Sequence, residues 1–507
     1  MRARKYIGLV GGGASAISFI NEFAKMKRLP AEQIVIYVFD KSDYLGPGNA
    51  YGPRDVQSNI LNTKAGYITA INGKAGDFYE WYLDNQEDLL VEFPRLYGPD
   101  DYVPRALFGK YMKYSFKDRS KQALLNGVQV VNVHAEVVDL EPDGDAFRVK
   151  TQCDGSYFVD TVVLACGTLK ADIDMDRVAN SAVFNDPYPV NKVVNAIQKD
   201  GRVGIIGSRL GAIDTVIGLA EAGHRGKISI FSRSGYFPWV RGTQGRYQCQ
   251  YLNPDEVQRL IDGLGRPLCL SDIGHLFIRE LEHYRENNED QLEPLSFPPA
   301  PITCLAEHLS NELSLSTGPR GWQAIIYNTN SMLSLIWNSL DESEKDMFFN
   351  ELLSPAISMR VSIPRENAVK ILELVNSGKV EFVAGEAVVT RHEGKHIIEC
   401  AGESIDVDYI VKAVGSPRRL AQTDSTLFKN LLSKGIVDQH KYGGLNVTHD
   451  NRVLDDQGNA FSRLFATGEV TSGVNLFTSA MDIICAQAAK CARSCSRAID
   501  ESSMEVA

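Results

Sequence analysis

The sequence predicts an α/β protein in which one strand–turn–helix unit occurs twice. Residues 6–10 and 202–206 are short apolar runs, and each enters a glycine-containing turn that leads into an amphipathic stretch. Two later apolar runs, residues 159–167 and 409–415, also end at glycine, as the closing strand of a parallel sheet would. The chain has 507 residues, which at about 150 residues per domain leaves room for two such sheets.

The first turn has the spacing of a site for a dinucleotide. It reads Gly11-x-Gly13-x-x-Ala16. Gly11 permits the turn, Gly13 lets the backbone approach a pyrophosphate, and Ala16 lets the helix pack closely on the strand. A second strand, residues 34–39, leads into Asp40, which is placed to hold a ribose hydroxyl. The alternative is a glycine-rich turn in an unrelated α/β domain.

The second turn differs from the first at one position. It contains Gly207 and Gly211, but Arg209 stands where the second glycine of the motif is expected. This side chain would either obstruct a pyrophosphate or grip it, and the sequence leaves both possibilities open. Arg233 follows the next strand, residues 227–231, and a cation there suits the 2′-phosphate of NADPH and favours NADPH over NADH. The alternative is a decayed site that is retained only for folding.

A third segment lies near the carboxyl end. Residues 464–469 form a predicted strand that ends in Gly468 and Glu469, and an apolar helix is expected from about residue 478. An acidic residue after such a strand can hydrogen-bond the ribityl hydroxyls of a flavin, and a helix amino terminus can stabilise reduced flavin. The alternative is an ordinary strand and a capped helix.

Composition and charge argue against several classes of protein. The net charge of −11 disfavours nucleic acid and anionic membranes as partners. No apolar stretch approaches the roughly 18 to 20 residues of a membrane span. The nine cysteines include no Cys-x-x-Cys pair, which disfavours the disulfide-reducing flavoenzymes and suggests reduced thiols in the cytoplasm. The nine histidines are dispersed, so no metal site is expected.

With these residues in place, the chain resembles flavoproteins that have two dinucleotide-binding domains, with FAD bound by the first and NAD(P)H by an inserted second. It resembles more closely an FAD/NAD(P)-binding family related to flavin-dependent N-hydroxylating monooxygenases. Members of that family carry Gly-Pro-Gly-x-Ala-Tyr after the second strand, here residues 46–51. The likeness extends through residues 61–65, 104–111 and 232–238, and it is scattered over most of the chain.

The resemblance implies a fold of two Rossmann-like domains plus helical insertions. Residues 1–190 would be the first part of the FAD-binding domain, and residues 404–507 would be its closing part. Residues 191–403 would form the NAD(P)H-binding domain, with a helical insertion at about 240–365. A second insertion is expected at about residues 65–125, and insertions at these places usually cover the flavin.

The resemblance also implies which residues bind the cofactors. Val137 would meet the adenine through its backbone, and Glu469 stands where such families usually have aspartate. No catalytic residue is assigned. The residues assigned to FAD are Gly11, Gly13, Ala16, Asp40, Gly48, Asn62, Thr63, Val137, Gly167, Gly468 and Glu469, and those assigned to NADPH are Gly207, Arg209, Gly211 and Arg233.

The function that the resemblance implies is an FAD-dependent, NADPH-using monooxygenase. Its substrates would be oxygen and a small polar or amino-acid-derived molecule that is hydroxylated on nitrogen. One alternative is a flavin oxidoreductase, either a dehydrogenase or a reductase, that does not insert oxygen. Another is a flavin- or nucleotide-binding sensor in which Arg209 marks the loss of hydride delivery. The sequence leaves the oligomeric state open.

Overall fold

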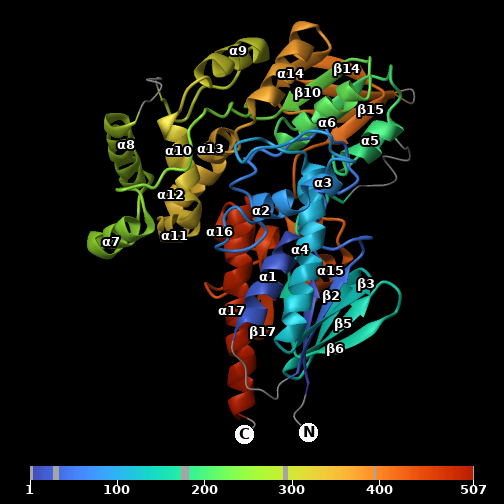
Figure 1. Cartoon of the computed structure of the whole chain (residues 1–507), viewed down its shortest axis with the longest axis vertical. Coiled ribbons are helices and arrows are strands. Elements are labelled where there is room, and N and C mark those ends of the chain that lie inside the picture. Colours follow the sequence, from blue (N-terminus) through green and yellow to red (C-terminus); the bar gives the residue numbers. More distant parts are fainter. Residues whose placement is uncertain (1–3, 27–32, 173–181, 289–294, 393–394, 506–507) are drawn as a thin grey trace. The chain divides into compact units, whose positions relative to one another are not determined.

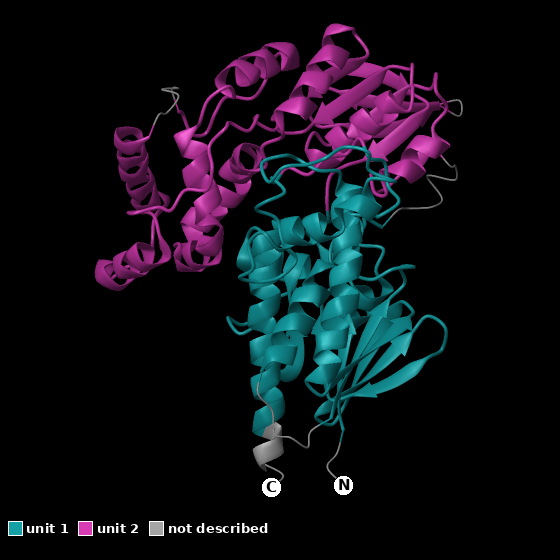
Figure 2. Ribbon diagram, in the orientation of Figure 1, with its two compact units in different colours: residues 1–57, 63–173, 416–507 teal, residues 58–62, 174–415 magenta. Residues whose placement is uncertain are grey.

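A computed structural model describes residues 4–26, 33–172, 182–288, 295–392 and 395–505 of the chain (Figure 1). The chain forms two compact units (Figure 2). Unit 1 comprises residues 1–57, 63–173 and 416–507, and unit 2 comprises residues 58–62 and 174–415. Among the described residues, no helix combines the length and the apolar character that crossing a membrane requires.

Unit 1 is built on a six-stranded sheet in the order β16-β17-β7-β1-β2-β3. All neighbouring strands are parallel except β16 and β17. The carboxyl ends of the parallel strands therefore meet at one edge, which is where open α/β sheets bind their ligands. The strands are β1 (Lys5–Val10), β2 (Ile34–Asp40), β3 (Val128–His134), β7 (Thr161–Leu164), β16 (Arg452–Leu454) and β17 (Ala460–Ala466).

Three long helices and a small antiparallel sheet complete unit 1. Helix α1 (Ala14–Lys25) contacts both α4 (Arg105–Leu125) and α17 (Met481–Glu505). The predicted insertion after residue 65 is largely helical, because α4 and the shorter α2 (Asp77–Asp84) and α3 (Gln86–Leu89) lie within it. The small sheet consists of β4 (Val137–Asp143), β5 (Ala146–Thr151) and β6 (Ser156–Val159), and α15 (Thr426–Ser433) packs on β4.

Unit 2 repeats this order of elements. Its five-stranded sheet has the order β11-β10-β9-β15-β8, and all neighbours are parallel. A strand–helix–strand unit, β9-α6-β10, corresponds to β1-α1-β2, and an antiparallel sheet again precedes the closing strand β15. The strands are β8 (Val183–Phe184), β9 (Val203–Ile206), β10 (Ile228–Ser232), β11 (Val380–Ala384), β12 (Val388–His392), β13 (Lys395–Cys400), β14 (Glu403–Val407) and β15 (Tyr409–Lys412), and the helices are α5 (Val190–Ala196), α6 (Leu210–Glu221) and α14 (Arg365–Asn376).

The chain between β10 and α14 is a helical insertion with its own apolar core. Its first helix illustrates how the sequence sets the boundaries, because Asn253 caps the amino terminus and Gly265, at φ 62°, ends the helix. Trp322, Ile325 and Met359 belong to the core. The helices are α7 (Pro254–Leu264), α8 (Leu270–Asn287), α9 (Leu305–Leu315), α10 (Gly321–Asn328), α11 (Leu333–Ser339), α12 (Glu342–Met347) and α13 (Leu353–Arg360).

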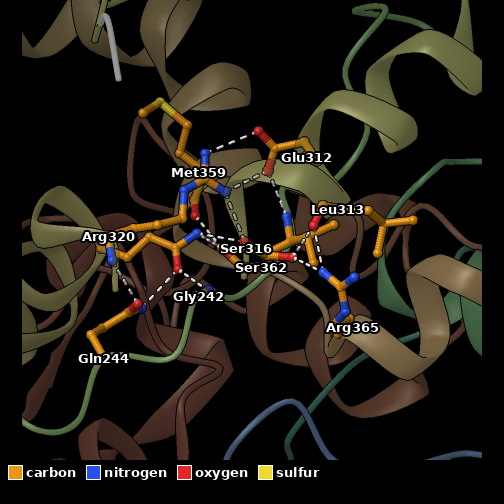
Figure 3. Close-up of polar contacts among 11 residues, drawn as sticks. Gly242, Gln244, Glu312, Leu313, Ser316, Arg320, Met359, Ser362 and Arg365 are labelled. Carbon is orange, nitrogen blue, oxygen red and sulfur yellow. Dashed lines mark hydrogen bonds and ion pairs between the residues drawn. The ribbon is translucent and has the colours of Figure 1, made fainter. Parts of the chain in front are cut away.

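A buried ion pair within this insertion holds the segment that directly follows β10 (Figure 3). Arg320 and Glu312 have side-chain exposures of 1% and 3%, and the guanidinium binds both carboxylate oxygens, at 2.6 and 3.0 Å. The carboxylate also accepts the Val240 N–H at 2.8 Å, and Arg320 donates to the Val240 carbonyl at 2.9 Å. Gln323 accepts the Gly242 N–H at 3.0 Å. The backbone of residues 240–242 is therefore fixed by buried side chains of the insertion.

The substitution Glu312→Gln is expected to destabilise unit 2 strongly, because it leaves the buried Arg320 guanidinium without its charged partner. Breaking a buried pair from one side costs about 3–5 kcal/mol. Urea unfolding followed by hydrogen exchange of unit 2 peptides measures the loss. The matched control is Glu256→Gln, which breaks the exposed pair between Glu256 and Arg259 in the same insertion and should cost less than about 1 kcal/mol. Equal effects of the two substitutions would contradict a stabilising role of the buried pair.

Candidate dinucleotide sites

The turn after β1 requires glycine at Gly11. Its φ is 107°, and an added Cβ atom would lie 2.2 Å from the Ala165 carbonyl oxygen. The Gly11 N–H donates to the Phe39 carbonyl at 2.9 Å. The turn is thereby held between the ends of β7 and β2, where the motif places it.

Asp40 ends β2, and its carboxylate is fixed beside this turn. Oδ2 accepts the Gly12 N–H at 2.7 Å, and Oδ1 accepts the Ser42 N–H at 2.8 Å and the Ser42 hydroxyl at 2.5 Å. A carboxylate oxygen offers more than one lone pair, so Asp40 can still accept a hydrogen bond from a ribose hydroxyl. Gly12, which the sequence motif does not single out, lies close to Leu45, because an added Cβ there would lie 2.3 Å from Leu45 Cδ2.

Gly13 and Gly48 line a space that side chains would fill. A Cβ atom added to Gly13 would meet only the Gly48 Cα within 4 Å, at 3.7 Å, and one added to Gly48 would meet only the Gly13 Cα, at 3.9 Å. The loop that carries Gly48 is docked on the turn, because the Gly46 N–H donates to the Gly12 carbonyl at 2.7 Å. Helix α1 begins at this point without a side-chain cap. Uncapped N–H groups beside a cradle of two glycines fit the pyrophosphate of FAD.

Five other residues assigned to FAD lie outside the glycine turn, and one of them belongs to unit 2. Ala16 is fully buried in α1, and Gly167, at φ 67°, follows β7 with no atom within 4 Å of an added Cβ. Val137 is the first residue of β4 and pairs with Thr151. Thr63 belongs to unit 1, whereas Asn62 belongs to the short segment of unit 2.

The closing strand β17 brings Gly468 to the start of α1, since a Cβ atom added to Gly468 would lie 3.1 Å from Ser15 Oγ. Glu469 Oε2 accepts a hydrogen bond of 2.6 Å from the Thr478 hydroxyl. Burial raises the pKa of the Glu469 carboxyl, and this hydrogen bond partly offsets the rise. The helix predicted from about residue 478 begins at Met481, and Thr478 instead orients Glu469.

This segment contains a strained turn that the sequence did not indicate. Leu476 has φ 60° and ψ −58°, and the Phe477 N–H donates to the Asn475 carbonyl at 2.7 Å, which defines a γ-turn. A bulky residue with positive φ is rare, and such strain concentrates at functional sites. Because leucine carries no turn signal, no residue pattern could have indicated this conformation.

His440 is a further residue that no sequence motif indicated. Its Nδ1 accepts the Tyr442 N–H at 3.2 Å. The imidazole lies against Gly473, where an added Cβ would lie 2.3 Å from Nδ1. Glycine at position 473 therefore gives the ring its place beside the segment that follows β17.

Cys166 is the thiol next to the first turn. Burial and the nearby charge of Asp40 raise its pKa to about 12. A thiol with this pKa stays neutral near pH 7 and is a poor nucleophile. None of the nine cysteines, all of which lie within the described residues, forms a disulfide.

The second turn, in unit 2, has the same backbone geometry as the first. Gly207 has φ 110°, an added Cβ would lie 2.3 Å from the Ala413 carbonyl oxygen, and its N–H donates to the Phe231 carbonyl at 2.9 Å. Ser232 at the end of β10 is therefore the structural equivalent of Asp40 at the end of β2. Its hydroxyl oxygen lies 3.0 Å from that of Ser208. No carboxylate stands at the end of β10.

Arg209 is the structural equivalent of Gly13. The backbone angles are φ −96° and ψ −161° at Arg209, and φ −84° and ψ −154° at Gly13. Its guanidinium Nη2 donates to Ser354 Oγ at 3.3 Å, and Ser354 Oγ lies 2.6 Å from Ser234 Oγ. The side chain is thus directed toward the segment that follows β10. Arg233 in that segment is exposed, and Gly211 packs against Pro187, 2.8 Å from an added Cβ.

These features define a class of protein. Two parallel sheets, each with a glycine turn between its first strand and first helix and a small antiparallel sheet before its closing strand, make a fold with two dinucleotide-binding domains. Residues 8–169 match the model of a family described as FAD-NAD(P)-binding. The predicted resemblance to FAD/NAD(P)-binding flavoproteins is confirmed, and so is the predicted cofactor class.

Individual relatives extend the comparison over the whole chain. A nitrosuccinic acid synthase from Aspergillus oryzae is 22% identical over 590 residues, covering 94% of this chain and 88% of that protein. The ornithine hydroxylase of Pseudomonas aeruginosa matches with a TM-score of 0.55 and 14% identity, covering 98% of this chain and 100% of that one. The L-lysine 6-monooxygenase of Pseudomonas syringae matches with a TM-score of 0.54 and 14% identity, covering 97% and 99%. The predicted fold class is confirmed.

Proposed function

We propose that this protein is an FAD-dependent, NADPH-using monooxygenase that hydroxylates a nitrogen of a small polar or amino-acid-derived substrate. The observation that carries the proposal is the pair of equivalent turns. Gly11 and Gly207 have matching φ values and matching backbone partners, but the first turn is followed by a carboxylate and the second by serine and arginine. One chain thus offers two different dinucleotide sites.

The residues of unit 1 would hold FAD. Gly13, Gly48 and the start of α1 would receive the pyrophosphate, and Asp40 would bind the adenosine ribose. Glu469, oriented by Thr478, would bind the ribityl chain. When bound, FAD supplies the acceptance of hydride and the activation of oxygen, while the protein positions it and excludes water.

The residues of unit 2 would select NADPH. A carboxylate at the end of β10 would repel a 2′-phosphate, and Ser232 removes that repulsion. Arg233 would pair with the phosphate, and we propose that Arg209 grips the cofactor rather than obstructing it, because its guanidinium is already drawn toward Ser354 and Ser234.

The relatives support nitrogen as the atom that is oxidised. The names of the ornithine and lysine enzymes denote oxygenation of amino acids, and nitrosuccinic acid is a four-carbon acid with two carboxyl groups and a nitro nitrogen. The neutral Cys166 and the absence of a Cys-x-x-Cys pair from the sequence speak against reduction of disulfides. Free thiols also suit a reducing compartment, and we propose the cytoplasm.

The test is incubation of the purified protein with NADPH, isotope-labelled oxygen gas and a panel of amino acids and small amines, read by mass spectrometry. The proposal expects one labelled oxygen atom on the nitrogen of at least one compound, together with consumption of NADPH. NADPH oxidation that never transfers label to any compound would instead favour an oxidoreductase that does not insert oxygen.

A further inference from the structure

Two arginine side chains pack on one corner of the helical insertion in unit 2. The corner is the junction of α10 with the turn that follows it, and we name it the arginine corner: Arg241, Tyr327, Thr329, Asn330 and Arg360. The Arg241 guanidinium carbon lies 4.3 Å from the centroid of the Tyr327 ring. Arg360 Nη2 donates to Thr329 Oγ1 at 2.8 Å and to Asn330 Oδ1 at 2.6 Å.

Arg241 has no counter-ion in the part of the chain that the structure describes. Its Nε is buried and makes no hydrogen bond, and the same holds for the Tyr327 hydroxyl. Buried donors without acceptors are destabilising unless water or a ligand satisfies them. The Arg241 guanidinium on the face of the Tyr327 ring and the buried Tyr327 hydroxyl therefore place donors for an anion side by side.

The backbone beneath Arg241 is rigid. The Arg241 N–H donates to the Ile363 carbonyl at 2.9 Å, and the Ile363 N–H donates to the Trp239 carbonyl at 2.8 Å. The preceding residue, Val240, is held by the buried pair of Glu312 and Arg320 (Figure 3). The guanidinium is thus carried by a fixed segment, and fixed positions are what distinguish binding sites from exposed arginines.

We propose that the arginine corner binds a carboxylate group of the substrate, which makes the substrate a small carboxylic acid. Arginine presents a planar set of donors that matches a carboxylate, and the Tyr327 hydroxyl supplies a further donor. Two guanidinium groups on one corner favour a compound with two carboxylates over one with a single acid group. The identification of the bound acid as the substrate rests on the proposed function. The binding of the acid to the protein can be measured independently of that function.

The test uses succinate, which has two carboxylates and no nitrogen to oxidise. Isothermal titration calorimetry of the full-length, flavin-loaded protein should show succinate binding and no binding of its uncharged diamide or of 1,4-diaminobutane. The substitution Arg241→Ala should weaken succinate binding at least about tenfold, and Tyr327→Phe should weaken it several-fold. Arg241→Lys should bind weakly too, because lysine lacks the planar donor set.

The matched control is Arg279→Ala. Arg279 also stacks on a tyrosine of the insertion, with its guanidinium carbon 3.8 Å from the Tyr251 ring, but it lies outside the arginine corner. Its loss should leave succinate binding unchanged. If the wild-type protein does not bind succinate, or if Arg241→Ala and Tyr327→Phe bind it as tightly as wild type, the inference is overturned.

The two failures remain distinguishable. Succinate binding that depends on Arg241, together with no oxygenated product from any acid, would overturn the proposed function and leave the carboxylate site standing. Oxygenation of an amine without any carboxyl group, unaffected by Arg241→Ala, would keep the monooxygenase and overturn the carboxylate site. If Arg241→Ala does not fold by circular dichroism, Tyr327→Phe and Arg241→Lys decide the question.

Discussion

The substitution Gly13→Val is expected to weaken FAD binding strongly while leaving the protein folded. Gly13 has φ −84°, which valine can adopt, and its added Cβ meets only the Gly48 Cα at 3.7 Å. The side chain would instead fill the space between the two glycines that we assign to the pyrophosphate. Steric crowding of about 1–3 kcal/mol corresponds to roughly a ten- to hundredfold loss of affinity. The flavin content of the purified variant measures the effect.

The matched control is Gly274→Val. Gly274 lies within α8, has no positive φ, and has no atom within 4 Å of an added Cβ, so the same substitution there should leave flavin content at the wild-type level. A Gly13→Val protein that is folded and carries a full complement of FAD would contradict the placement of the pyrophosphate at this turn.

The substitution Arg233→Ala is expected to raise the KM for NADPH by about ten- to hundredfold and to leave the KM for NADH within about twofold. The reason is that a hydrogen-bonded charge on the 2′-phosphate contributes about 1.5–3 kcal/mol, and NADH has no such phosphate. Arg209→Gly should also raise the KM for NADPH if Arg209 grips the cofactor. Steady-state kinetics with both nucleotides measures these changes.

The control for these variants is Arg225→Ala. Arg225 precedes β10, whereas Arg233 follows it, and its bidentate pair with Asp200 is exposed. Its loss should leave both KM values unchanged. A lower KM for NADPH in Arg209→Gly would show that the arginine obstructs the site, and an unchanged NADPH preference in Arg233→Ala would remove Arg233 from phosphate recognition.

The sequence was most informative where backbone geometry allows only one residue type. Gly11 and Gly207 are required by a φ near 110° and by the nearness of a carbonyl oxygen, so their spacing predicted both turns and hence both sheets. The positions of β1 and β9 followed from buried apolar runs, whereas the strand expected at residues 464–469 is β17, which ends at Ala466.

Features set by tertiary contacts could not be predicted in this way. The direction of the Arg209 guanidinium depends on Ser354, which lies 145 residues away in the chain. The γ-turn at Leu476 and the contact of the His440 ring with Gly473 arise from packing that no local sequence pattern predicts. Residues 58–62 belong to unit 2 only because of contacts in the folded chain. The sequence therefore gave no sign that Asn62 and Thr63, both assigned to FAD, lie in different units.

The central claim is that one chain binds FAD and receives hydride from NADPH. The most direct measurement is anaerobic rapid mixing of the purified, flavin-loaded protein with NADPH or with NADH, followed by absorbance in the flavin band. We expect NADPH to bleach the flavin band rapidly and NADH to bleach it more slowly. In Arg233→Ala, the two nucleotides should bleach the flavin at similar rates. A bound flavin that stays oxidised under excess of both nucleotides would contradict the central claim.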